Sequence, residues 1–118
     1  MKREIITTFE GEEILRLIGQ NVKTARLRRN ESETMLAERL GVSRATIARL
    51  EAGNGGVALG LAVEALLSYG FADQLFALGH PDVDGVGKRL DRLRTPVRGN
   101  GRAVQPRQTS GIRPGTKS

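Results

Sequence analysis

Residues 36–53 read LAERLGVSRATIARLEAG and predict two short helices joined by a tight turn. Leu36 and Leu40 lie on one apolar face of the first helix. Gly41 follows them, and glycine ends a helix at little cost because it readily adopts a positive φ. Ser43 is a favourable N-cap for the second helix. In this order, the signals together predict the two-helix arrangement more specifically than any one of them does alone.

The second of these helices has one apolar and one exposed face. Ile47 and Leu50 point inward, which leaves two alanines and two arginines, Arg44 and Arg49, on the other side. This arrangement is a helix-turn-helix, and short or cationic side chains on its second helix suit a DNA major groove. An ordinary helical hairpin with a solvated arginine face is the alternative interpretation.

The two arginines carry the main chemical hypothesis. A guanidinium can bond bidentately to guanine O6 and N7, which contributes about 1–3 kcal/mol of discrimination against other bases. A solvated or phosphate-bound side chain is the alternative for each arginine. Ala45 and Ala48 can contact thymine methyl groups, whereas Thr46 lies nearer the core and is partly structural.

Composition narrows the class of protein. The 118 residues include no cysteine, which excludes disulfides and thiolate chemistry. No apolar run approaches the ~20 residues that span a bilayer, and the N-terminus lacks the apolar region of a secretory signal. We therefore expect a cytoplasmic, nucleoid-associated protein without a membrane partner.

Positive charge is concentrated near the C-terminus. Residues 1–80 carry equal numbers of basic and acidic side chains, whereas residues 81–118 hold nine Lys/Arg against three Asp. The net charge of +6 therefore comes from residues 81–118. Such a tail can strengthen binding to a polyanion such as DNA, or it can fold onto a protein partner.

Apolar periodicity predicts five helices that close one small core, followed by a short extension. We expect a flexible arm at 1–11, a helix-turn-helix DNA-binding domain at 12–80, a short helical extension at 81–94 and a disordered basic tail at 95–118. The expected helices span residues 12–29, 33–40, 44–51, 59–67, 71–78 and 86–94. The expected inward stripes include Ile14, Leu17, Ile18 and Val22 in the first helix, Leu59, Ala62, Val63, Leu66 and Leu67 in the fourth, and Phe71, Leu75 and Leu78 in the fifth.

The block from residue 21 to residue 78 resembles the Xre/Cro-type helix-turn-helix regulators. The residues that carry this resemblance are Val22, Arg26, Leu36-Ala37, Leu40-Gly41-Val42-Ser43, Thr46-Ile47, Arg49-Leu50-Glu51 and Gly53. Three further stretches make the chain similar to the HipB-like antitoxins of Hip-type toxin–antitoxin modules. They are residues 51–60 (EAGNGGVALG), residues 66–70 (LLSYG) and residues 89–98 (RLDRLRTPVR).

The resemblance implies an all-α, five-helix, lambda-repressor-like fold and a homodimer. This homodimer would bind a near-palindromic operator in double-stranded DNA and repress its own operon. It also implies a HipA-like serine/threonine kinase toxin as a protein partner. The candidate DNA-binding residues are Ser43, Arg44, Ala45, Thr46, Ala48 and Arg49. Arg26 and Glu51 align with a structural ion pair between the first helix and the recognition helix.

Two positions depart from the family pattern. Relatives often carry Gln at the first position of the second helix, where it touches a phosphate, but this chain has Glu33, which would repel the DNA backbone. Relatives cap the fourth helix with Ser or Thr, where this chain has Ala58, which we expect to cost about 1 kcal/mol of stability.

The sequence offers little for catalysis, and we expect no enzyme, no cofactor and no metal site. The one histidine, His80, precedes a proline in a linker and is best interpreted as a surface residue. Asp82 to Gly85 resembles part of a calcium loop, but no acidic residue follows at the spacing that completes one.

Three functions remain open at this point. The first is a transcriptional repressor that is also an antitoxin. The second is a protein-interaction module that holds a kinase-like partner and binds DNA weakly or not at all, which Glu33 and the neutral first 80 residues favour. The third is a phage-type repressor without a toxin partner.

Overall fold

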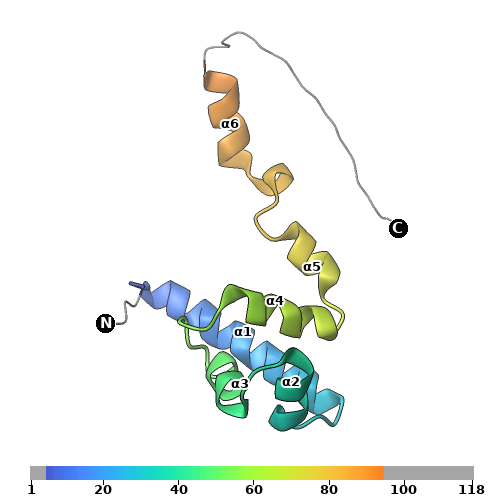
Figure 1. The fold of residues 1–118 in the computed structure, drawn as a ribbon. Coiled ribbons are helices and arrows are strands. Elements are labelled where there is room, and N and C mark those ends of the chain that lie inside the picture. Colours follow the sequence, from blue (N-terminus) through green and yellow to red (C-terminus); the bar gives the residue numbers. More distant parts are fainter. Residues whose placement is uncertain (1–4, 95–118) are drawn as a thin grey trace. The chain divides into compact units, whose positions relative to one another are not determined.

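The computed structural model describes residues 5–94, and every regular element in this range is a helix (Figure 1). The predicted all-α fold is therefore confirmed. The expected disordered tail at 95–118 lies outside the described residues. The helices are α1 (Phe9–Arg28), α2 (Glu33–Leu40), α3 (Arg44–Glu51), α4 (Leu59–Ser68), α5 (Ala72–Ala77), the 3₁₀-helix η1 (Pro81–Val83) and α6 (Gly85–Leu93).

Capping side chains set the ends of the helices near the turn. Ser32 Oγ accepts a hydrogen bond from Met35 N at 3.0 Å, and Gly41 ends α2 with a φ of 73°. The bounds of α2 and α3 agree with the prediction. In contrast, α1 begins at Phe9, three residues before its predicted start, because Thr8 Oγ1 caps it by accepting from Gly11 N at 2.9 Å.

The core lies where α3 packs against α1 and α2, with α4 against α2 (Figure 1). Val22, Leu36 and Ile47 are fully buried and come from these three different helices. Burial of large aliphatic side chains is the main stabilising contribution to such a small domain. The buried cluster consists of Val22, Ala25, Leu36, Ala37, Ile47, Leu50, Leu61, Ala65 and Tyr69.

The expected apolar stripes extend beyond this core. Leu59 is 77% exposed, whereas Leu61 and Ala65, which the predicted stripe omits, are the buried residues of α4. In α1, Ile14 and Leu17 are exposed, because its buried residues all lie in the half that begins at Gly19. A helix buries only the face that another element covers, so periodicity alone could not identify these exposed positions.

Helix α5 is shorter than predicted and buries little. It packs against α4, but Phe76 and Leu78 are 81% and 77% exposed, contrary to the inward position expected for Leu78. Phe71 and Leu75 are half-buried.

The chain divides into two compact units after Leu78. The second unit, as far as it is described, holds η1 and α6. The carboxylate of Asp84 caps α6 by accepting from Gly87 N at 2.8 Å. None of the helices described between residues 5 and 94 is long and apolar enough to cross a membrane.

Candidate DNA-binding surface

Helix α3 presents one face to the core and the opposite face to solvent. Ile47 and Leu50 are buried in the core. On the other side Ser43, Arg44, Ala45 and Arg49 are exposed, and Thr46 and Ala48 are half-buried. The six candidate contact residues therefore lie on or beside one outward surface. We call this outward surface, formed by these six residues, the α3 outer face.

The beginning of α3 is fixed by side-chain hydrogen bonds. Ser43 Oγ accepts from Thr46 N at 3.1 Å and shares a second hydrogen bond with Thr46 Oγ1 at 2.9 Å. An N-cap of this kind contributes about 1 kcal/mol to helix stability. Both hydroxyl groups therefore have a structural role whether or not they touch a ligand.

A buried ion pair ties α1 to the end of α3. Arg26 Nε donates to Glu51 Oε2 at 2.7 Å and Arg26 Nη2 to Glu51 Oε1 at 2.9 Å. The two side chains are only 6% and 4% exposed. The hydrogen bonds to Glu51 raise the pKa of the Arg26 guanidinium above its ordinary value, even though burial acts in the opposite direction. Arg26 is thus fully engaged inside the domain and is not a free contact for DNA.

A second ion pair lies at the other end of α3, on its solvent side. Arg44 Nη1 donates to Glu33 Oε1 at 2.8 Å, with 65% of the arginine side chain and 23% of the glutamate side chain exposed. Sequence reasoning treated Glu33 only as a repulsive charge. The overlooked signal was an acid in the first turn of α2 and a base in the first turn of α3, two helices that pack together.

A polar cluster behind the motif holds α2 against the end of α4. Arg39 donates two hydrogen bonds to the Glu31 carboxylate, both at 3.0 Å, and the Tyr69 hydroxyl donates a third at 2.8 Å. The guanidinium groups of Arg29 and Arg39 lie 5.0 and 5.5 Å from the Tyr69 ring centre. The bonds from Arg39 and then Tyr69 hold the pKa of Glu31 below its ordinary value. Sequence reasoning missed this cluster.

Two glycines allow α1 to approach the C-terminal end of α3. A Cβ atom at Gly19 would lie 2.5 Å from the backbone oxygen of Glu51. Gly53 has a φ of 85°, and a Cβ atom there would lie 2.6 Å from Arg16 Cα. Neither position has room for a side chain, so backbone contact sets how α3 is held.

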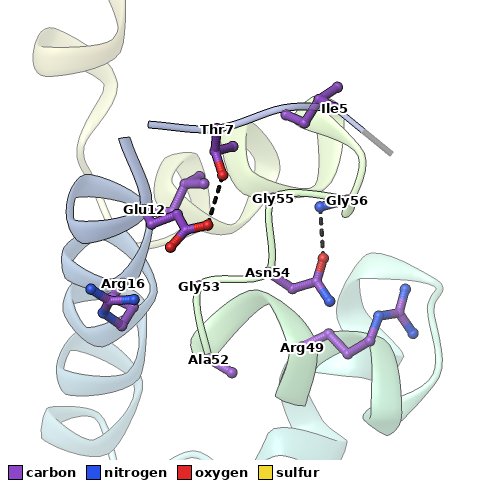
Figure 2. Close-up of a pocket in the computed structure, with 11 residues that line it drawn as sticks. Ile5, Thr7, Glu12, Arg16, Arg49, Ala52, Gly53, Asn54, Gly55 and Gly56 are labelled. Carbon is purple, nitrogen blue, oxygen red and sulfur yellow. Dashed lines mark hydrogen bonds between the residues drawn. The ribbon is translucent and has the colours of Figure 1, made fainter. Parts of the chain in front are cut away.

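A hollow of about 890 Å³ lies between the N-terminal arm, α1 and the loop from α3 to α4 (Figure 2). Among its described lining residues the one carboxylate is Glu12, which accepts a hydrogen bond from Thr7 Oγ1 at 2.8 Å. Figure 2 shows that Arg16 and Arg49 extend to opposite sides of the hollow and do not converge. The lining residues that the structure describes offer neither a nucleophile–base pair nor a two-arginine clamp for an anion.

The residues for which the sequence predicts no catalytic or metal-binding role lie at ordinary structural positions. His80 is exposed, and its Nδ1 accepts a hydrogen bond from Asp82 N at 3.0 Å. Asp84 serves as the cap of α6. Within residues 5–94, no three His, Cys, Asp or Glu side chains gather in a way that could hold a metal ion.

Comparison with known proteins agrees with this geometry. Residues 22–66 match the family model described as Helix-turn-helix, and they form an Xre/Cro-like domain. The match covers 45 of the 118 residues and supports a DNA-binding transcription regulator, a class that is generally non-enzymatic. No curated protein and no solved structure matched the chain.

Proposed function

We propose that the protein is a sequence-specific transcriptional repressor that inserts α3 into the major groove of its operator. The observation that carries this proposal is the α3 outer face, where Arg44 and Arg49 are exposed on a helix anchored by core side chains and by the Arg26–Glu51 pair. A recognition element must be rigid to place a side chain against a base edge, and this one is held at both ends.

We assign a role to each residue of the α3 outer face. Arg44 reads a guanine through two hydrogen bonds, and Arg49, near the other end of the helix, binds a base or a phosphate. Ala45 and Ala48 are short enough to let the backbone approach thymine methyl groups. Ser43 and Thr46 bind phosphate with the hydrogen-bonding capacity that their mutual contact leaves free.

The proposed active form is a homodimer on a near-palindromic operator, working in the cytoplasm on the nucleoid. Exposed large apolar side chains support it, because they offer surface that a second copy could cover. In the first unit they include Phe9, Leu59, Phe76 and Leu78. Sedimentation equilibrium tests this point, and a mass of one chain at the concentrations that bind DNA contradicts it.

The deciding experiment measures binding of the full chain to labelled DNA from upstream of its own gene. Fluorescence anisotropy is recorded against scrambled DNA across a salt series. We expect preference for the upstream duplex and a steep loss of affinity with salt, because bound phosphates release counterions. The variant Arg44→Ala should lose that preference and keep most of its affinity for scrambled DNA. Equal affinity of the wild-type chain for both duplexes would remove the repressor proposal.

A second candidate function is an antitoxin that also holds a HipA-like kinase toxin. The second unit favours a protein partner, since α6 leaves Val86, Leu90 and Leu93 exposed and also bears basic side chains. Val83 of η1 is exposed as well. Coexpression with a kinase-like protein encoded beside this gene, followed by size-exclusion chromatography in moderate salt, tests it. A stable complex without DNA preference favours the interaction module, and DNA preference without any complex favours a repressor that lacks a toxin.

A further inference from the structure

The Glu33–Arg44 pair is anchored from the glutamate side. Glu33 is the first residue of α2, directly after the N-cap Ser32, where the helix dipole favours a carboxylate. It is only 23% exposed, whereas Arg44 is 65% exposed. The shorter, less exposed side chain therefore holds the longer, more exposed one, and the pair directs the guanidinium.

The pair leaves Arg44 with enough donors to read a base. A guanidinium has five N–H groups, and the contact with Glu33 is made by Nη1. Within residues 5–94, no other acceptor bonds to the Arg44 guanidinium. Two parallel donors suffice for guanine O6 and N7, so ion pairing and bidentate base contact are compatible.

The pair also changes how Arg44 responds to the DNA backbone. The Glu33 carboxylate lies 2.8 Å from Arg44 Nη1. A more distant phosphate therefore meets a guanidinium whose positive charge is largely offset by this carboxylate. The directional hydrogen bonds to a base edge act at contact and survive this compensation. Sequence-independent attraction is therefore weakened more than base reading.

We propose that Glu33 is a positioning residue that makes Arg44 selective for guanine, by aiming the guanidinium at the base edge and withholding it from phosphates. This inference rests on the proposed function, since it concerns how the α3 outer face reads its operator. It predicts that Glu33 lowers affinity for random DNA while raising discrimination.

The test selects duplexes from a random-sequence library with the full-length wild-type chain and then with Glu33→Gln. We expect the wild-type motif to contain a guanine whose preference disappears in Arg44→Ala. In Glu33→Gln that preference should fall several-fold. Affinity for scrambled DNA should rise, and the salt slope should steepen by about 0.9, the contribution of one further phosphate contact.

Two further variants separate positioning from charge. Glu38→Gln removes one negative charge from an exposed residue of the same helix that forms no ion pair with any described residue, so the guanine preference should remain. Glu33→Asp keeps the charge but shortens the side chain by one methylene group. We expect it to lose guanine preference, but to steepen the salt slope less than Glu33→Gln does, because a carboxylate remains near the guanidinium. Thermal unfolding checks that every variant is folded.

The outcomes distinguish this inference from the function on which it rests. If the wild-type chain enriches no motif, the proposed function fails and the inference falls with it. If a motif with an Arg44-dependent guanine is enriched and Glu33→Gln keeps full preference, only the inference is overturned. The same holds if Glu38→Gln lowers the preference as much as Glu33→Gln does.

Discussion

The inner and outer faces of α3 each carry one arginine–glutamate pair of nearly the same length. Arg26 and Glu51 meet at 2.7 Å in the core, and Arg44 and Glu33 meet at 2.8 Å at the surface. The chemistry is shared, but the buried side chains are at most 6% exposed, whereas Arg44 is 65% exposed. Burial therefore decides what a pair does: the inner one holds the helices together, and the outer one remains available to a ligand.

Breaking the inner pair should have the largest effect on stability. Arg26→Met leaves the Glu51 carboxylate buried without its partner, and removal of one member of a buried pair costs about 3–5 kcal/mol. Urea unfolding followed by circular dichroism measures the change. A loss below about 1 kcal/mol would contradict the structural role of the pair.

The double variant Arg26→Met, Glu51→Leu is the matched control. Apolar side chains in place of both charges remove the unpaired carboxylate, so most of the lost free energy of unfolding should return. A double variant no more stable than Arg26→Met would indicate that the bonds themselves, rather than an orphaned charge, account for the effect.

The cluster around Glu31 offers a case of intermediate burial, since its side chain is 19% exposed. Glu31→Gln should lower stability by about 1 kcal/mol at neutral pH. Because the folded-state pKa of Glu31 is lowered, its contribution is complete above its ordinary value of 4.5 and is lost as pH falls through the lowered pKa. Thermal unfolding of both proteins from pH 7 to pH 2 should therefore show convergence in acid.

The N-terminal caps of α3 and α4 provide a further comparison. α3 has Ser43 as a working cap, whereas Ala58 makes no side-chain hydrogen bond at the start of α4. Ala58→Ser should raise the free energy of unfolding by about 0.5–1 kcal/mol, with the wild-type chain, whose alanine offers no cap oxygen, as the reference. A serine variant no more stable than the wild-type chain would show that the backbone there cannot use a side-chain cap.

Breaking the outer pair should change stability least. Glu33→Gln should alter the free energy of unfolding by less than about 0.5 kcal/mol, because exposed ion pairs contribute little. The effect that we propose for Glu33→Gln is on DNA recognition instead. A loss as large as that of Arg26→Met would show that the outer pair is structural and that burial does not separate the two.

The sequence was sufficient to predict the helix-turn-helix because interactions between residues close together in the chain specify it. Ser32, Gly41 and Ser43 mark the ends of α2 and α3 through backbone hydrogen bonds and φ angles that depend on neighbours in the chain. The partner of Glu33 was not predictable in this way, since it depends on the angle between two packed helices. The exposure of Leu59 and Phe76 likewise depends on which elements cover them.

The glycine contacts between α1 and α3 bear on how a genetic screen would be interpreted. Gly19 and Gly53 lie off the α3 outer face, yet neither can accept even a methyl group without moving backbone atoms. A library selected for loss of the proposed repression would therefore recover substitutions at these two positions alongside those at Arg44. Sorting the recovered variants by soluble yield would separate the two groups, because only the glycine variants lose the fold.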